Sequence, residues 1–223
     1  MQKQFWVLCF IFCSLHQVAR PQTIEHDLVS WSGAMLTVRF GESPWSAQVF
    51  VQNRMVQNLS QFQTVVFLLY GLYRFVPSSS VGAGYIFLTP INNRILDIFS
   101  FQLWHDFKIG EMPAVLRLRA ESLAWHALQD PFFEVIRSWR FRIRPELAIP
   151  IAGNFSWLIN NEWFFTLEAP VWNQNRFQTG VRYRQPGIVI DVLYQNRIIN
   201  RMSPQPVRME HILLLNFFYT LTV

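Results

Sequence analysis

The segment Arg137–Ile149, RSWRFRIRPELAI, constrains the fold of this chain more than any other stretch. Its even-numbered positions carry Ser, Arg, Arg, Arg, Glu and Ala, and its odd-numbered positions from Trp139 onward are all apolar. Successive side chains of an extended strand point to opposite faces, so a strand separates the charged residues from the apolar ones. A helix would mix them around its circumference. The segment is therefore predicted to be a β-strand with one charged and one apolar face.

The pattern alone does not fix which face of this strand meets water. The charged face lies outside in a soluble β-sandwich, but it lies inside in a membrane barrel, whose strands are apolar toward lipid. The class of function depends on this choice.

The N-terminus has the pattern of a secretory signal peptide. Lys3 precedes an apolar run, Phe5–Leu15, which is too short to span a bilayer as a helix. We expect residues 1–21 to be the signal peptide, although no small-x-small site specifies the cleavage point. Residues 22–223 are then expected to form a single domain, since no composition shift divides them.

The composition of the chain after the predicted signal peptide limits the stabilising features and the binding partners that can be expected. Both cysteines, Cys9 and Cys13, lie in the leader, so a secreted mature chain would be held by its core or by lipid instead of by disulfides. Charged residues make up 15% of the chain, well below the roughly 25% of an ordinary soluble domain. Removing Lys3 and Arg20 from the 19 basic residues leaves 17 against 14 acidic ones. This small excess does not favour a nucleic-acid partner.

Alternation with a period of two returns along the chain in blocks such as Trp45–Arg54, Gln61–Phe75 and Ala114–Trp125. The blocks exceed the usual strand length of about 5–6 residues and match the roughly 9–11 tilted residues that cross a bilayer as a strand. The pattern predicts an all-β fold, a single transmembrane antiparallel up-and-down β-barrel.

The connections between the blocks alternate in length. The short ones are Gly41–Pro44, Pro77–Ser79, Gly110–Met112, Pro150–Gly153 and Gln185–Gly187, and His126–Phe133 and Ile199–Arg208 are longer. Bacterial barrels have short periplasmic turns, longer outer loops and an even number of strands. With about eleven clear blocks and a further strand expected near Thr23–Ser30, we predict about twelve strands, with about ten as the alternative.

The chain ends in His211–Val223, where one parity is apolar from Leu213 to the last residue. Such a strand is predicted to pair with the first strand, because pairing removes the free edge. Four tryptophans near block ends are candidates for the aromatic girdles of a membrane barrel. They are Trp45, Trp104, Trp139 and Trp172.

In a membrane barrel the charged parity of each strand points into the lumen. The residues predicted to form a lumen-facing charged network are Arg117, Arg119, Glu121, Arg140, Arg142, Arg144, Glu146, Glu162, Arg176, Arg182 and Arg184. Asp106, Glu168 and Asp191 are further candidate partners for the arginines. Two interpretations remain open: an ion-pair network that fills a narrow barrel, or a pore with a preference for anions.

Several segments of the chain resemble the bacterial family called domain of unknown function 2490, whose members are predicted outer-membrane barrels. They are WNQNRFQTGVRYR at Trp172–Arg184, RLRAE at Arg117–Glu121, RFRIR at Arg140–Arg144, NEWFF at Asn161–Phe165, HILLLNFFY at His211–Tyr219 and GAGY at Gly82–Tyr85. RLRAE is followed here by Ser122 and Leu123, where the family pattern has a further basic residue. The resemblance implies a barrel in the outer membrane of a Gram-negative bacterium, and it implies no activity.

A catalytic site has weak support in the sequence. The best trio is His126 with Ser122 and Asp130, and no nucleophile motif surrounds it. His105 is next to Asp106, but neighbours on a strand face opposite ways. No spacing of histidines predicts a metal site, and no glycine-rich loop predicts a cofactor.

The sequence therefore favours a non-enzymatic integral outer-membrane barrel, a narrow channel or an envelope scaffold. Its expected partners are outer-membrane lipids, the barrel assembly machinery during insertion and, in the channel version, small solutes. One alternative is an outer-membrane lipid hydrolase or acyltransferase. The other is a soluble periplasmic β-sandwich or ligand-binding barrel.

Overall fold

The computed structural model describes residues 24–91, 94–127, 135–167, 169–199 and 207–223. The predicted signal peptide lies outside these residues, as do Asp130 and Glu168. Helices of sufficient length and hydropathy to span a membrane are absent from the described part of the chain.

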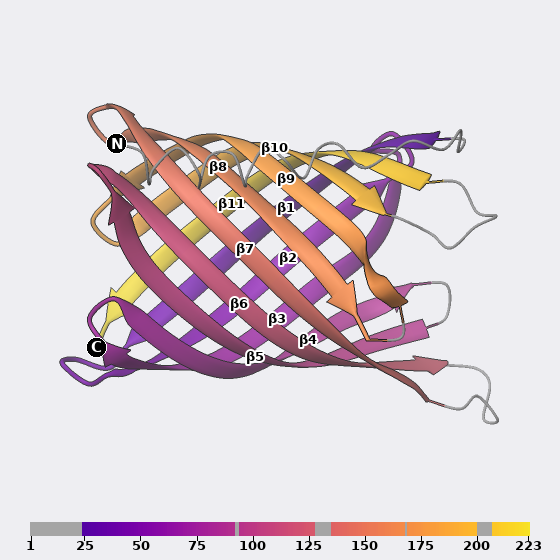
Figure 1. Cartoon of the computed structure of the whole chain (residues 1–223), viewed down its shortest axis with the longest axis horizontal. Helices are drawn as coiled ribbons and strands as arrows, with labels where there is room; N and C mark the ends of the chain where they lie inside the picture. The colour runs from indigo at the N-terminus through magenta and orange to yellow at the C-terminus, as the bar shows by residue number, and fades with distance from the viewer. Residues whose placement is uncertain (1–23, 92–93, 128–134, 168, 200–206) are drawn as a thin grey trace.

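The described residues form eleven strands that close into one barrel (Figure 1). The strands are β1 (Ile24–Arg39), β2 (Trp45–Val56), β3 (Gln61–Val76), β4 (Ser79–Ile91), β5 (Arg94–Ile109), β6 (Met112–Ala127), β7 (Ile136–Ala152), β8 (Phe155–Thr166), β9 (Ala169–Gln185), β10 (Ile188–Ile199) and β11 (Val207–Thr222). Each strand pairs antiparallel with its neighbours in sequence, as an up-and-down arrangement requires. The expected all-β barrel is therefore confirmed.

The barrel closes between β1 and β11, as predicted, but these two strands run parallel, from Ile24 beside Val207 to Arg39 beside Thr222. The parallel pair follows from the odd number of strands, because the first and last strands of an odd meander point the same way. The prediction of about twelve strands or about ten, all antiparallel, was therefore wrong for the described residues. The strand expected near Thr23–Ser30 is the first half of β1, which continues without a break to Arg39.

Short turns gather at one end of the barrel, which we call the short-turn rim (Figure 1). Four of its turns contain a glycine in the left-handed region, namely Gly41 (φ 54°), Gly110 (φ 63°), Gly153 (φ 52°) and Gly187 (φ 77°). Glycine adopts this conformation without steric cost, so each turn can be tight. The C-terminus lies at the same rim, where the Val223 amide donates to the Arg39 carbonyl at 2.9 Å. β1 begins at the opposite rim.

The outer surface of the barrel is apolar. On β7, the side chains of Trp139, Phe141 and Ile143 are 45%, 42% and 39% exposed, whereas the arginines between them are partly buried. On β11, the apolar parity from Leu213 to Leu221 is also exposed. The charged parity of these strands therefore faces the inside of the barrel, and the arrangement is not a β-sandwich.

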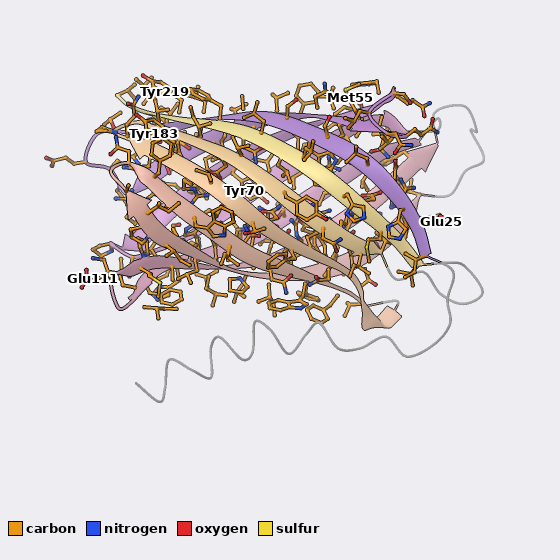
Figure 2. All side chains as sticks on the ribbon, turned by 90° about the horizontal axis from the view of Figure 1, so that it is seen from above. Glu25, Met55, Tyr70, Glu111, Tyr183 and Tyr219 are labelled. Atoms are coloured by element: carbon orange, nitrogen blue, oxygen red, sulfur yellow. The ribbon has the colours of Figure 1, made fainter. Side chains whose placement is uncertain are left out.

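Aromatic side chains ring the outside near the short-turn rim. Trp45 packs on Tyr73 with ring centroids 4.9 Å apart, and Phe155 packs on Tyr183 at 5.1 Å. Tyr183 and Tyr219 lie at one end of the barrel in Figure 2, with Met55 near the other end.

Two of the four tryptophans proposed for a girdle, Trp45 and Trp139, lie on the outer surface. Trp104 was predicted wrongly, since it shares the inward parity of β5 with Gln102 and Asp106 and lines the inside of the barrel. The side chain of Trp172 lies outside the described residues.

Two buried apolar clusters occupy part of the interior. One contains Trp31 and Leu158 and joins β1, β2, β7, β8, β10 and β11. The other surrounds Tyr70 and joins β3, β4, β5 and β6. Gly84 makes room for Tyr70, because a Cβ at Gly84 would lie 2.6 Å from the tyrosine ring and 2.3 Å from the Leu69 carbonyl oxygen. The interior of the barrel is therefore filled by side chains where these two clusters lie.

Candidate functional site

The charged residues of β6 and β7 meet inside the barrel because of strand register. Arg117 is opposite Arg144, Arg119 is opposite Arg142, and Glu121 is opposite Arg140. Like charges on opposite positions destabilise a sheet unless a counter-charge lies between them. The carboxylates of Glu121 and Glu162 supply that counter-charge.

Glu121 is fully buried and is the centre of the first group of ion pairs. Its carboxylate accepts from Arg140 Nε at 2.7 Å, from Arg142 Nη1 at 2.7 Å and from Arg119 Nη1 at 3.3 Å. An unpaired carboxylate at this depth would be very unfavourable, so these arginines are required for its burial.

Glu162 on β8 is the centre of the second group and is 3% exposed. Its carboxylate lies 2.7 Å from Arg142 Nη2, 3.2 Å from Arg117 Nη2 and 3.8 Å from Arg176 Nη1. Arg142 therefore bridges Glu121 and Glu162, and it joins β6, β7 and β8 in a single network.

Buried aromatic rings contact the same guanidinium groups. Phe164 is completely buried, and the Cζ atoms of Arg142 and Arg176 lie 4.5 Å and 4.4 Å from its ring centroid. Each such contact contributes about 2 kcal/mol where water is excluded. The ring thus stabilises cations that share a small number of carboxylates.

A third group of ion pairs lies closer to the short-turn rim. Arg182 on β9 donates from Nη1 to Glu146 at 2.6 Å and from Nε to Asp191 at 2.7 Å. Arg144 Nη2 donates to the other oxygen of Glu146 at 2.7 Å. Asp191 thus fulfils the partner role proposed for it from sequence.

A fourth group, toward the opposite rim, was missed by the sequence reasoning. Arg208 of β11 lies 3.0 Å from both Asp27 and Glu210, and Arg197 lies 2.8 Å from Glu210. Arg54 stacks 4.2 Å from the ring centroid of Trp31. These residues lie at the inward-facing positions of their strands. The alternation of side chains along each strand could therefore have identified them as interior residues.

The structure places the predicted network residues on the inward parity of β6, β7, β8 and β9. All of them except Arg184 take part in an ion pair of the groups above. Arg184 is exposed at the short-turn rim, and within the described residues it forms no ion pair. Asp106 also lies at this rim and accepts from the Trp104 indole at 2.9 Å, so it is not a partner of the central arginines.

The trio of His126, Ser122 and Asp130 is not assembled in the described residues. His126 instead lies on the outer surface with its Nε2 atom 3.0 Å from Asp97, which also accepts from the Tyr85 hydroxyl. Asp130 lies outside the described residues.

A different histidine contacts a serine. The Ser79 hydroxyl and His105 Nδ1 are 2.8 Å apart on outward-facing positions of β4 and β5 near the short-turn rim, where Ser79 is itself buried. Within the described part of the chain, no carboxylate orients this histidine, and no group of three or more His, Cys, Asp or Glu residues could hold a metal ion. In the described residues, His105 thus contacts a hydroxyl group and His126 contacts a carboxylate, so the two partners of a catalytic histidine are divided between two different histidines.

A comparison with protein families matches residues 29–208 to a family described as a protein of unknown function, DUF2490. Curated proteins and solved structures give no match to the chain.

Proposed function

The chain belongs to the DUF2490 family of proteins of unknown function, and we propose that it is a non-enzymatic integral barrel of the bacterial outer membrane, with a lumen closed by its own side chains. Within this proposal it acts as an envelope scaffold and does not act as an open pore. Its partners are outer-membrane lipids and, during insertion, the barrel assembly machinery.

One observation carries the membrane part of this proposal: the barrel is apolar outside and charged inside. Leu213 and Leu215 of β11 are 51% and 53% exposed, while Glu121 is completely buried. A soluble barrel has the opposite distribution, because exposed apolar surface lowers solubility and buried charge lowers stability. In a bilayer the same surface contacts lipid at no cost. Strands of 12–17 residues also exceed the length needed for a crossing.

The packed interior supports closure over conduction. An ion pathway needs a continuous hydrated passage through the barrel. Here two apolar clusters and the ion pairs of Arg142 occupy space inside the barrel. A barrel of about eight strands is already filled by its side chains, and large Arg, Tyr, Trp and Phe side chains can fill a somewhat wider one. The geometry thus favours the filled network over the anion-selective pore.

Localisation is tested by fractionation and gel migration. We expect the native protein to stay with membranes after a urea wash and to migrate differently in gels with and without boiling. Recovery in the soluble periplasmic fraction would contradict the membrane assignment.

Closure is tested separately in planar lipid bilayers. We expect the wild type to give no steady conductance, and Arg142→Ala to open one because it removes the bridge between Glu121 and Glu162. Arg137→Ala, on the outer surface, is the matched control and is expected to stay closed. A steady wild-type conductance would establish the channel version in place of the scaffold. No conductance in any of the three proteins would show that closure does not depend on Arg142.

The lipid hydrolase is retained as the second candidate because of the contact between Ser79 and His105. This candidate function requires that the protein hydrolyse an envelope phospholipid and that Ser79→Ala lose the activity. Ser80→Ala is the control and should retain the activity, because the Ser80 hydroxyl lies inside the barrel. Absence of turnover with phospholipid and lipopolysaccharide substrates would leave the non-enzymatic proposal.

A further inference from the structure

The short-turn rim opens into a cavity of about 1150 Å³ inside the barrel. We call this cavity the vestibule. Its wall includes residues of most strands, among them Thr37 of β1, Ser46 of β2, Ser80 of β4 and Thr220 of β11. These hydroxyl groups can donate hydrogen bonds into the cavity. The vestibule lies inside the ring of strands, so its lining is separated from the apolar outer surface.

The charged residues of the vestibule are mostly cations. Its lining contains Arg39, Arg74, Lys108 and Arg184, and Asp106 is its only acidic residue among the described ones. Asp106 already accepts the Trp104 indole proton at 2.9 Å. The vestibule therefore has a net positive charge.

These four cations differ from the arginines deeper in the barrel. Arg117, Arg142 and Arg182 are each paired with a buried carboxylate. Within the described residues, no ion pair is formed by Arg39, Arg74, Lys108 or Arg184. Their charge is consequently available to a bound anion, and a concave site with low-dielectric walls strengthens the attraction.

The vestibule adjoins the lumen-facing charged network at its inner end. Trp104 lines the cavity, and the guanidinium of Arg117 lies 5.6 Å from its ring centroid, with Glu162 beyond it at 3.2 Å. If the lumen is closed as proposed above, the vestibule is a blind site for a ligand and does not lead into a passage.

We propose that the vestibule binds a small soluble anion that carries two or more phosphate or carboxylate groups. The cations come from four different strands, β1, β3, β5 and β9, so a ligand with several charged groups can contact more than one of them. Arginine donates two parallel hydrogen bonds to phosphate or carboxylate, and the hydroxyls of the wall add neutral donors. A cavity of about 1150 Å³ has room for such a molecule. The inference goes beyond the envelope role and does not depend on the location of the barrel.

The test uses the full mature chain in detergent micelles, with inorganic pyrophosphate and citrate as probes in isothermal titration calorimetry. The two probes separate phosphate from carboxylate recognition. We expect saturable binding of at least one probe, with a weaker affinity at higher salt. Arg74→Gln and Arg184→Gln are each expected to weaken it about tenfold, the loss that corresponds to one charge-assisted hydrogen bond.

Arg137→Gln is the matched control, because it removes the same charge from the outer surface near the opposite rim. It is expected to leave the affinity unchanged, and all variants should keep the heat-modifiable migration of the wild type. Absence of binding of both probes at about 10 mM, or an equal loss in Arg137→Gln, would overturn the proposal. Such a result would leave the membrane assignment intact, since that assignment rests on fractionation.

Discussion

Arg182 of β9 reaches across β8 to Glu146 of β7, with its Nη1 atom 2.6 Å from Glu146 Oε1. The two residues are not on neighbouring strands, so the contact depends on the curvature of the closed barrel. Arg182 also bonds Asp191 through Nε at 2.7 Å. One guanidinium group therefore links three strands, β7, β9 and β10, from the inside of the barrel.

A double-mutant cycle measures this contact. Arg182→Met is expected to lower the free energy of unfolding by about 3–5 kcal/mol, because it leaves the buried Asp191 without its arginine. Glu146→Gln is expected to cost about 1–3 kcal/mol, because Arg182 keeps Asp191 and only Arg144 loses its carboxylate. The double variant is expected to lose less than the sum, by a coupling of about 0.5–3 kcal/mol. Urea unfolding in lipid vesicles supplies the three values. Additive losses would show that the two side chains do not interact.

Glu121 is expected to be the carboxylate on which stability depends most. Glu121→Gln removes the counter-charge shared by Arg119, Arg140 and Arg142, and we expect a loss of about 3–5 kcal/mol. Glu111→Gln, in an exposed turn, is the control and is expected to change stability by less than about 0.5 kcal/mol. The measurement is the temperature at which each variant, heated before electrophoresis, stops migrating as the compact folded form. This temperature should be lower for Glu121→Gln than for Glu111→Gln. Equal temperatures for the two variants would contradict the role of Glu121.

Gly84 and Gly71 provide a test of packing without charge. A methyl group at Gly84 would lie 2.3 Å from the Leu69 carbonyl oxygen, whereas a methyl group at Gly71 would have no neighbour within 4 Å. Gly84→Ala is therefore expected to destabilise the barrel by about 1–3 kcal/mol, as overpacking does, and Gly71→Ala is expected to be neutral or slightly stabilising. Urea unfolding distinguishes them. A Gly84→Ala variant as stable as wild type would show that β3 and β4 can separate locally.

Sequence reasoning found the barrel because alternation is a local property of each strand. The pattern of Arg137–Ile149 and the glycine turns need no knowledge of distant residues. The roughly eleven alternating blocks agree with the eleven strands of the described residues, and the count failed because a twelfth strand was added near Thr23–Ser30 to give the even number typical of bacterial barrels. A separate strand could be placed there because both faces of β1 are mixed. Ser30 and Ser32 lie on its outer face between apolar neighbours, while Val29 and Trp31 belong to the interior cluster. Alternation is therefore weak in the middle of β1, so the residues before Trp31 could be assigned to a strand of their own.

The ion-pair groups were predictable only in part. Parity identified which arginines share a face, but the β6–β7 register decides that Arg142 is opposite Arg119, and the β7–β8 register places Glu162 diagonally beside Arg142. Arg54 and Arg197 come near the ends of their blocks, where a turn residue is an equally good interpretation. The vestibule depends on which cations lack a partner, and no local pattern contains that information.

The parallel pairing of β1 with β11 makes a prediction about orientation. It places the start of β1 and the C-terminus at opposite rims. If the protein is inserted as proposed and its short turns face the periplasm, as is usual in bacterial barrels, β1 begins at the cell-surface side and the C-terminus faces the periplasm. Single cysteines test this, because the only native cysteines are Cys9 and Cys13 in the predicted signal peptide.

Two single-cysteine variants are used, Asn58→Cys and Glu111→Cys. Asn58 lies in the turn after β2 at the opposite rim, and Glu111 lies in the turn after β5 at the short-turn rim. With a maleimide that does not cross membranes, we expect intact cells to label Asn58→Cys and not Glu111→Cys. Lysed cells should label both, and the wild type should label in neither case once the leader is removed. Labelling of Glu111→Cys alone on intact cells would invert the orientation and place the vestibule at the cell surface. Labelling of neither variant on intact cells, with both reactive after lysis, would contradict insertion in the outer membrane.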